Sequence, residues 1–268
     1  MNLKQALAKK LTKKELSLLK TSFDIVGSIA IIDIPEELEK KEKIIAEELL
    51  NLIKHVKTIL KKTGIRYGKY RRQKLKFLIG ERKKITTHKE SNSRLKLNVE
   101  TCYFSSRLSH DRLRIMNQVK PQEKILVMFS GIAPYQIVIA RNTKVKEIIG
   151  VEFNPEAHKY ALENLKLNKV ENKIKLYCGD VKKIVPKLGK FDRILMPAPK
   201  NAENFLDVAK KASKKNTTIH FYCFATENEL KKFKELIKQK FNCKILDCIK
   251  TNQHKPRSYR YRIDFKVL

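Results

Sequence analysis

The sequence predicts an α/β protein in which a small basic α/β domain precedes a larger domain built on a parallel sheet. At 268 residues with 42% hydrophobic content, the chain can bury the cores of two modest domains. In its second half, apolar β-rich segments alternate with turns and amphipathic helices, a pattern typical of parallel strands joined by crossover helices. We therefore expect an N-terminal helical extension at 1–22, a small basic domain at 23–102 and the larger domain at 103–268.

Basic residues are unevenly distributed along the chain. Sixty Lys and Arg oppose 28 Asp and Glu, a formal net charge of +32. Residues 51–110 alone contain seventeen basic and three acidic side chains. The lysine-rich composition of heat-adapted proteins adds acids together with bases and does not account for this excess. Because such a field concentrates polyanions, we expect a nucleic acid partner that contacts this segment.

Several kinds of site and location are disfavoured by the sequence. The five cysteines form no C-x-x-C pair, so neither a disulfide framework nor a zinc site is expected. The N-terminus is a basic amphipathic stretch without the apolar region of a signal peptide, and no apolar run reaches 18 residues. We expect a monomeric cytoplasmic protein without metal or membrane contact.

The small domain is predicted from four patterned segments that follow the basic N-terminal helix. The apolar, β-branched residues 27–35 indicate a buried strand. Residues 35–64 begin with Pro and acids and end with Lys and Gly, as helices do, although 56–62 can already be a strand. Apolar and polar residues alternate in 74–80 and 94–100, which favours strands with one solvated basic face.

The larger domain is predicted from four strand, turn and helix units and a closing pair of strands. The four units are residues 124–141, 145–168, 173–188 and 191–212. A further strand (217–225) and helix (229–241) lead to two last strands, 243–252 and 260–268. We expect these last two strands to form an antiparallel edge of the sheet.

The first two turns of the larger domain are candidate ligand contacts, because ligands of open parallel sheets bind outside the carboxyl ends of the strands. In the turn 129–134, Gly131 lets the backbone approach a ligand and the next helix offers N–H groups to a carboxylate, although such turns are as often plain connections. In 150–155, Glu152 ends a strand about 20 residues downstream, the placement that binds ribose hydroxyls. The alternative is an acid that stabilises a helix start.

The third and fourth turns face the same edge of the predicted sheet. In the turn 177–181, Asp180 can accept a hydrogen bond from an exocyclic amine such as adenine N6, and Val181 offers its backbone N–H, although Gly-Asp is also a simple turn signal. In the loop 194–200, the prolines provide a rigid surface for a planar base, or they merely end the strand.

At this point the sequence resembles a known family on several colinear motifs. They are CYFSSRLSHDR (102–112), MFSGIAPY (128–135), FNPEA (153–157), DRILM (192–196) and TIHFYCF (218–224). The sequence is similar to the class I tRNA guanine-37 N1-methyltransferases of archaea and eukaryotes and to their sister aminocarboxypropyl transferases of wybutosine synthesis. The resemblance extends from residue 23 to the end. It implies a Rossmann-type transferase domain, S-adenosylmethionine (AdoMet) as cofactor, and tRNA bound through its anticodon stem-loop and body.

The resemblance also implies roles for individual residues. The implied AdoMet contacts are Arg107, Arg112, Phe129, Gly131, Glu152, Phe153, Asp180, Val181 and Pro197. The implied catalytic residues are Asp111, Arg71, Tyr103 and Pro199. Asp111 stands where the family has its general base, a Glu, but a helix-start acid is an equal alternative. Arg71, or Arg72, matches the family's upstream catalytic Arg, and in so basic a stretch either is also a candidate phosphate contact.

Three departures from the family pattern bear on the substrate. Val127 replaces an acid, Ala133 replaces a glycine, and Pro197-Ala198-Pro199 stands where the family has Asn-Leu-Pro. Loss of the Asn amide removes a fixed hydrogen-bond partner of the target base, which favours a substrate other than ordinary guanosine. The family's first small domain would precede residue 23, where the sequence leaves no room. We therefore expect recognition of tRNA to depend on the 23–102 domain and the catalytic face.

The leading hypothesis is AdoMet-dependent methylation of the purine at position 37 of tRNA, 3′ of the anticodon. The target is either guanosine N1 or a tricyclic wyosine intermediate such as 4-demethylwyosine or the isowyosine precursor. One alternative is transfer of the aminocarboxypropyl group of AdoMet. A second alternative is a non-catalytic tRNA-binding protein whose cofactor site has decayed.

Overall fold

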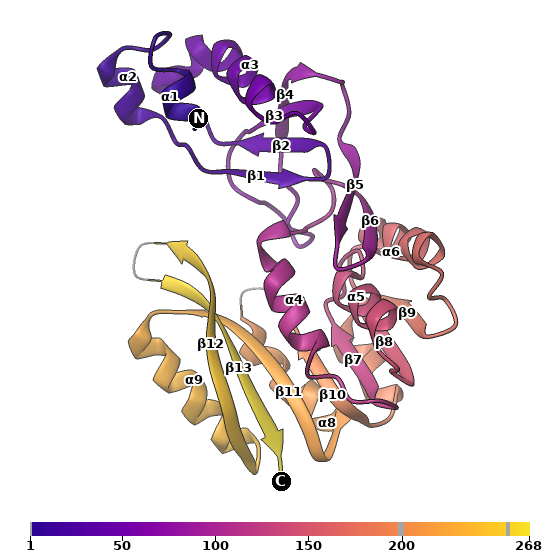
Figure 1. Ribbon diagram of the computed structural model, residues 1–268. Coiled ribbons are helices and arrows are strands. Elements are labelled where there is room, and N and C mark those ends of the chain that lie inside the picture. Colours follow the sequence, from indigo (N-terminus) through magenta and orange to yellow (C-terminus); the bar gives the residue numbers. More distant parts are fainter. Residues whose placement is uncertain (1, 198–200, 256–257) are drawn as a thin grey trace. The chain divides into compact units, whose positions relative to one another are not determined.

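The computed structural model describes residues 2–197, 201–255 and 258–268, and it divides into two compact units (Figure 1). The N-terminal unit comprises the chain up to Lys89 together with Arg94–Ser106. The C-terminal unit comprises Glu90–Ser93 and Arg107–Leu268. The chain therefore passes into the C-terminal unit briefly at 90–93 before it enters that unit for good at 107.

A four-stranded sheet forms the framework of the N-terminal unit. Its strands, in spatial order, are β1 (Phe23–Val26), β2 (Ile29–Ile32), β3 (Thr58–Lys62) and β4 (Leu75–Gly80). Strands β2 and β3 are parallel, whereas β1 and β4 pair antiparallel with their neighbours. A short 3-10 helix (Glu36–Lys41) and α3 (Glu42–Leu52) make the crossover from β2 to β3, and β5 (Ile85–Glu90) and β6 (Ser93–Asn98) form a separate hairpin. The strand option for 56–62 is confirmed in β3, whereas β1 was not predicted.

The two N-terminal helices belong to the core of this unit. Helices α1 (Leu3–Ala6) and α2 (Lys13–Leu18) each begin with a capping box. Leu3, Leu7 and Leu11 are buried in one apolar cluster with residues of α3 and of the sheet. Residues 1–22, which the sequence suggested to be an extension, therefore help to cover the sheet. Leu3 lies in α1, whereas Leu7 and Leu11 lie in the turn between α1 and α2.

The C-terminal unit contains a seven-stranded sheet whose order places the candidate turns together. The order is β12 (Cys243–Lys255), β13 (Ser258–Val267), β11 (Ser213–Ala225), β10 (Phe191–Met196), β7 (Lys124–Met128), β8 (Glu147–Glu152) and β9 (Ile174–Cys178). Neighbours from β11 through β9 are parallel, and β13 pairs antiparallel with β11 and β12. The predicted α/β fold with a parallel sheet and an antiparallel edge is confirmed.

Helices connect the strands of this sheet (Figure 1). They are α4 (Ser109–Met116), α5 (Pro134–Asn142), α6 (Pro155–Asn168), α7 (Val181–Ile184), α8 (Leu206–Ala212) and α9 (Glu227–Lys240), with 3-10 turns at Ser106–Leu108, Val185–Lys187 and Ala202–Phe205. Residues 125–128 of β7 are fully buried, as expected for a central parallel strand. The strand order reverses between β7 and β10, so the switch point of the sheet lies there.

Two glycines with the same backbone conformation provide a test of the packing in the N-terminal unit. Gly80 and Gly64 both have φ +93°, but a Cβ at Gly80 would lie 2.1 Å from the Lys57 carbonyl oxygen, whereas no described atom lies within 4 Å of one at Gly64. We expect Gly64→Ala to cost about 1 kcal/mol, from backbone strain alone. Gly80→Ala should cost clearly more, about 2 kcal/mol or above, because the clash is added. Urea unfolding of both variants measures the difference, and equal losses would contradict the described contact of β4 with Lys57.

Candidate active site

The first turn after β7 is held in an unusual backbone conformation. Phe129, Gly131 and Ala133 all have positive φ, at 60°, 57° and 66°. For a non-glycine residue this conformation costs on the order of 1–2 kcal/mol, and such strain clusters at functional sites. The Phe129 ring packs edge-on against Phe205 at 4.9 Å between centroids. Ala133, in the position where the family has a glycine, therefore still adopts the left-handed geometry of the turn.

Glu152 links the first turn to the second. One carboxylate oxygen accepts a hydrogen bond from the Gly131 amide at 2.6 Å, and the other accepts from the Asn154 amide at 2.8 Å. Burial raises the pKa of Glu152 and outweighs the backbone N–H groups that favour the charged form. The Phe153 amide also donates to this carboxylate, which leaves one of its roughly four lone-pair sites for a further donor. The carboxylate can therefore hold the turn and also accept a ribose hydroxyl.

The third turn is joined to the same group of loops. The Gly179 amide donates to the Glu152 carbonyl at 2.8 Å, and the Ser130 amide donates to the Val151 carbonyl at 2.9 Å. The Asp180 side chain caps α7 by accepting from the Lys182 amide at 2.8 Å. The turns after β7, β8 and β9 thus form one hydrogen-bonded edge that contains most of the residues expected to contact AdoMet. Their acceptors, and the N-terminus of α5, which has no side-chain cap, fit the polar groups of a nucleoside and an amino acid.

The remaining predicted cofactor residues lie in different environments. Phe153 is 46% exposed beside Glu152, and Val181 is buried at the start of α7. Pro197 directly follows the last residue of β10 and is half-buried, while Arg107 is exposed. Pro199 lies outside the described residues.

Arg112 has a protein partner. Its side chain is 2% exposed, and its Nε and one terminal nitrogen donate to the two oxygens of Glu90 at 2.5 and 2.6 Å. This bidentate pair fixes α4 to the end of β5. The guanidinium is therefore committed to a buried ion pair, and a direct contact of Arg112 with AdoMet stays a prediction that this geometry does not favour.

Asp111 is part of a buried network, which argues against its predicted role as general base. The carboxylate is 5% exposed. One oxygen accepts from the Arg262 guanidinium, and the other accepts from the hydroxyls of Tyr222 at 2.5 Å and Tyr135 at 2.9 Å. Burial, together with the Asp111 charge, raises the pKa of both tyrosines, so both remain donors. A cation and two phenols already occupy both oxygens, so the role of Asp111 as general base stays a prediction that this geometry does not favour.

The network extends from Arg262 across three strands. Arg262 also donates to Asp264 at 2.9 and 3.0 Å, and Asp264 lies 2.7 Å from Nδ1 of His220. Nε2 of His220 lies 2.7 Å from an Arg193 nitrogen, which can only donate, so Nε2 accepts and Nδ1 carries the proton. Burial lowers the pKa of His220, consistent with this neutral form. Arg193 ends the network in a pair with Glu123.

In the N-terminal unit, two predicted catalytic residues are in contact. The Arg71 guanidinium carbon lies 4.3 Å from the centre of the Tyr103 ring, and that of Arg66 lies 4.8 Å from it. A tight loop closed by a bridge between Tyr67 and Arg72, with Arg71 at φ +54°, brings the two cations together. Burial lowers the pKa of Arg66. The structure thus groups Arg71 with Tyr103 and adds Arg66, which the sequence analysis did not single out.

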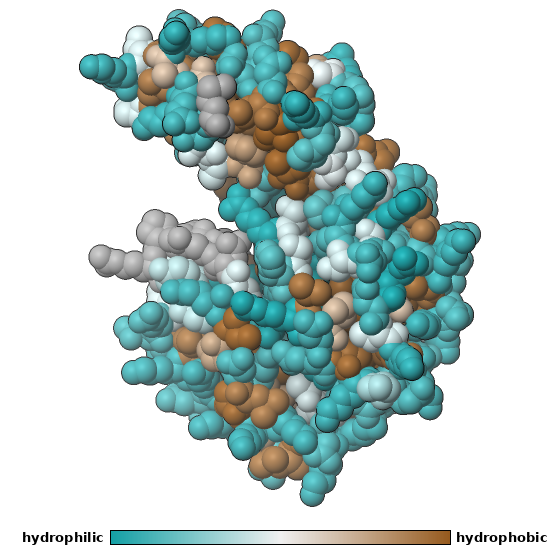
Figure 2. Space-filling model, viewed as in Figure 1, coloured by the Kyte–Doolittle hydropathy of each residue, from teal (hydrophilic) through white to brown (hydrophobic). Residues whose placement is uncertain are grey.

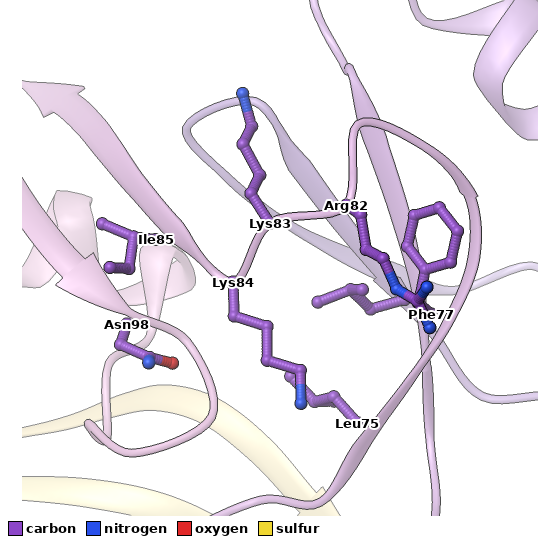
Figure 3. Close-up of a pocket in the computed structure, with 8 residues that line it drawn as sticks. Leu75, Phe77, Arg82, Lys83, Lys84, Ile85 and Asn98 are labelled. Carbon is purple, nitrogen blue, oxygen red and sulfur yellow. The ribbon is translucent and has the colours of Figure 1, made fainter.

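A hollow of about 640 Å³ in the same unit combines apolar and basic side chains (Figure 3). It is lined by Leu60, Leu75, Phe77, Arg82, Lys83, Lys84, Ile85 and Asn98. The Arg82 guanidinium lies 5.7 Å from the Phe77 ring centre, and Lys84 pairs with Glu100 at 2.7 Å. Cations beside an aromatic face are typical of surfaces that bind single-stranded nucleic acid. The hollow lies within the basic segment 51–110.

The visible surface of each unit is mostly hydrophilic, with smaller hydrophobic patches (Figure 2). In the described part of the chain, no helix is both long and apolar enough to span a bilayer. Among the same residues, no group of His, Cys, Asp and Glu side chains is arranged to hold a metal ion.

Comparison with known proteins identifies the family. Residues 86–246 match the TRM5/TYW2 methyltransferase domain, and residues 3–83 match the TYW2 N-terminal domain. The chain belongs to the TRM5/TYW2 methyltransferase family. The family resemblance expected from the sequence is therefore confirmed.

Individual relatives within the TRM5/TYW2 family cover most of the chain. The tRNA (guanine(37)-N(1))-methyltransferase Trm5b of Pyrococcus abyssi is 38% identical over 256 residues, which cover 93% of this chain and 76% of the relative. The tRNA (guanine(37)-N(1))/4-demethylwyosine(37)-methyltransferase Taw22 of Nanoarchaeum equitans is 36% identical over 269 residues, covering 81% of this chain and 88% of the relative. The solved complex of aTrm5 and tRNALeu has a TM-score of 0.91 at 31% identity and covers 100% of this chain and 78% of that chain.

The buried Glu152 carboxylate predicts a pH-dependent cofactor affinity in this family member. Because its pKa is raised, we expect AdoMet binding to weaken on acidification at a pH above the ordinary carboxyl value of about 4.3. Protonation turns one acceptor oxygen into a donor and removes a partner for ribose hydroxyls. Glu152→Gln should weaken binding about tenfold and abolish the pH step. Calorimetry across pH measures both effects, with the exposed Glu171→Gln as control. Unchanged affinity in the Glu152 variant would remove this residue from the site.

The buried pair of Asp111 and Arg262 predicts a loss of stability when it is broken. Asp111→Asn should destabilise the protein by about 3 kcal/mol, because it removes a charge that compensates a buried guanidinium. The double variant Asp111→Asn with Arg262→Met should lose less than the sum of the single losses. Thermal unfolding gives the comparison, and Asp207→Asn, which breaks a surface pair with Lys240, should change little. A fully stable Asp111→Asn protein with no activity would restore Asp111 as a candidate base.

Proposed function

We propose that this chain transfers the methyl group of AdoMet to the purine at position 37 of tRNA. The observation that carries the proposal is the hydrogen bond from Gly131 to Glu152, which joins the first two turns at the switch-point edge of the sheet. The relatives named for this activity support it, as does the basic N-terminal unit. The proposal extends to a monomeric, metal-free cytoplasmic protein.

The residues of the edge have separable tasks in this reaction. AdoMet, when bound, supplies an activated methyl group. Glu152 would accept a ribose hydroxyl, Asp180 an exocyclic amine, and the Val181 amide a ring acceptor. Because the displacement needs reactants in line, holding both in place provides much of the rate enhancement. Phe129 and Phe205, packed together, would exclude water from one side of the site.

The N-terminal unit supplies the contacts to RNA in this proposal. Arg66 and Arg71 on the Tyr103 ring, together with the hollow around Phe77, present cations and aromatic faces in one unit. Planar guanidinium groups suit phosphate oxygens and base carbonyls. We assign Arg71 and Tyr103 to the contact with the target region, and the hollow to the surrounding strand.

The loop after β10 supports a preference for a tricyclic target base. Pro197 follows Met196 at the end of the strand, where the family places an Asn. Proline offers no amide donor and a flat apolar surface. The missing hydrogen bond weakens the hold on guanine, and the apolar ring suits a larger fused base.

Incubation of tRNA with AdoMet, followed by nucleoside mass spectrometry, tests the activity and the preference together. We expect slow formation of 1-methylguanosine on an unmodified transcript, and turnover at least tenfold faster on tRNA that carries the tricyclic intermediate, because a missing partner costs about 1–3 kcal/mol. Pro197→Asn should raise guanosine methylation. Equal rates on both substrates would contradict the preference, and an aminocarboxypropyl product would contradict methyl transfer.

A further inference from the structure

Strand β13 carries charged side chains at alternate positions, the first three of which are Arg260, Arg262 and Asp264. Arg260, Arg262 and Asp264 are in register with Phe224, Tyr222 and His220 of β11. Alternate residues of a strand point to the same face of the sheet, so the three charges form one row. Asp264 and Arg262 pair with each other and with the buried network. Arg260 is the charge at the end of this row.

Arg260 is buried without an acidic partner in the described part of the chain. Its side chain is 5% exposed, and its Nε atom is buried with no hydrogen-bond partner among the described residues. Its guanidinium carbon lies 4.9 Å from the Tyr222 ring centre and 5.9 Å from that of Phe224. Aromatic faces stabilise a cation, but they do not accept hydrogen bonds from its N–H groups as an oxyanion does. A buried N–H group without an acceptor is costly, so the unpaired Nε–H of Arg260 is suited to an oxygen supplied by a ligand.

The position of Arg260 indicates which anion it meets. Because β13 is antiparallel to β11, Arg260 lies opposite Phe224, one residue before β11 ends at Ala225. It therefore lies at the carboxyl edge of the sheet, where ligands bind. Glu152 and Asp180 follow β8 and β9 on one side of the switch point, whereas Arg260 lies beyond β10 and β11 on the other. The cofactor residues and Arg260 thus occupy opposite halves of the edge.

We infer that Arg260 binds a backbone phosphate of the RNA strand beside the target nucleotide. This inference rests on the proposed function, which places RNA at this edge. The rings of Tyr222 and Phe224 pack beside the guanidinium of Arg260. The N–H groups along the edge of the guanidinium can then donate to two phosphate oxygens. The hydrogen bond from the Tyr222 hydroxyl to Asp111 fixes the Tyr222 ring, so the buried network holds the phosphate site in place.

Three variants test the inference: Arg260→Met, Arg260→Lys and the control Lys266→Gln. Lys266 lies on the same strand, in register with Thr218 near the opposite edge, so its replacement removes an equal charge away from the site. Binding of an unmodified tRNA transcript, binding of AdoMet, thermal unfolding and methyl transfer are measured for each protein. We expect Arg260→Met to weaken tRNA binding about tenfold and to lower the slope of log K against log salt by about 0.7–0.9. The tRNA affinity of Arg260→Lys should lie between those of the natural chain and Arg260→Met, because lysine keeps the charge but loses the bidentate guanidinium.

The same measurements separate the possible failures. AdoMet affinity should be unchanged and the unfolding temperature of Arg260→Met unchanged or higher, because no internal pair is broken. A loss confined to AdoMet affinity would assign Arg260 to the cofactor carboxylate and overturn the inference. A large fall in unfolding temperature, or tRNA binding and salt slope equal to those of the natural chain and of Lys266→Gln, would also overturn it. If the natural chain binds tRNA but transfers no methyl group, the proposed function fails, while the comparison of binding still decides the role of Arg260.

Discussion

The buried pair of Asp111 and Arg262 is the interaction that ties together four elements of the C-terminal unit. It joins α4 to β13, and through Tyr135 and Tyr222 it also reaches α5 and β11. An ion pair in this environment is stable only when its remaining donors and acceptors are satisfied, and the tyrosine hydroxyls and Asp264 satisfy them. These four elements are thereby held in one arrangement.

The sheet and its turns could be predicted from the sequence because their signals are local. Apolar runs bounded by glycine or proline mark β7, β8 and β10. Glu152 is the last residue of β8, and Asp180 lies two residues after β9. The hairpin partner β1 escaped prediction because four residues carry too little periodicity. The sequence predicted residues 1–22 to be a helical extension, because the spacing of their leucines does not reveal the sheet that they help to cover.

The charged network could not be predicted, since its partners are far apart along the chain. Asp111 and Arg262 are 151 positions apart, and Tyr222 is 111 positions from Asp111. An acid at a helix start and an arginine in a strand give no signal of pairing by themselves. Only the antiparallel pairing of β13 with β11 brings Arg262 close to Asp111. The structural contacts of Asp111 follow from that pairing. The sequence did contain one signal: RYRID places Arg260, Arg262 and Asp264 on one face of a strand, and charges of both signs on one face favour pairing.

The protonation of His220 fixes the charge balance of the network. With a neutral imidazole, the three carboxylates of Asp111, Asp264 and Glu123 outnumber the two guanidinium groups of Arg262 and Arg193, which leaves one surplus negative charge. Arg260, close enough to influence the Tyr135 hydroxyl, carries a positive charge next to that surplus. The attraction lowers the cost of burying Arg260 in the free protein and also moderates its pull on a phosphate. An enzyme that must release a modified RNA after each turnover benefits from such a moderate affinity for the phosphate.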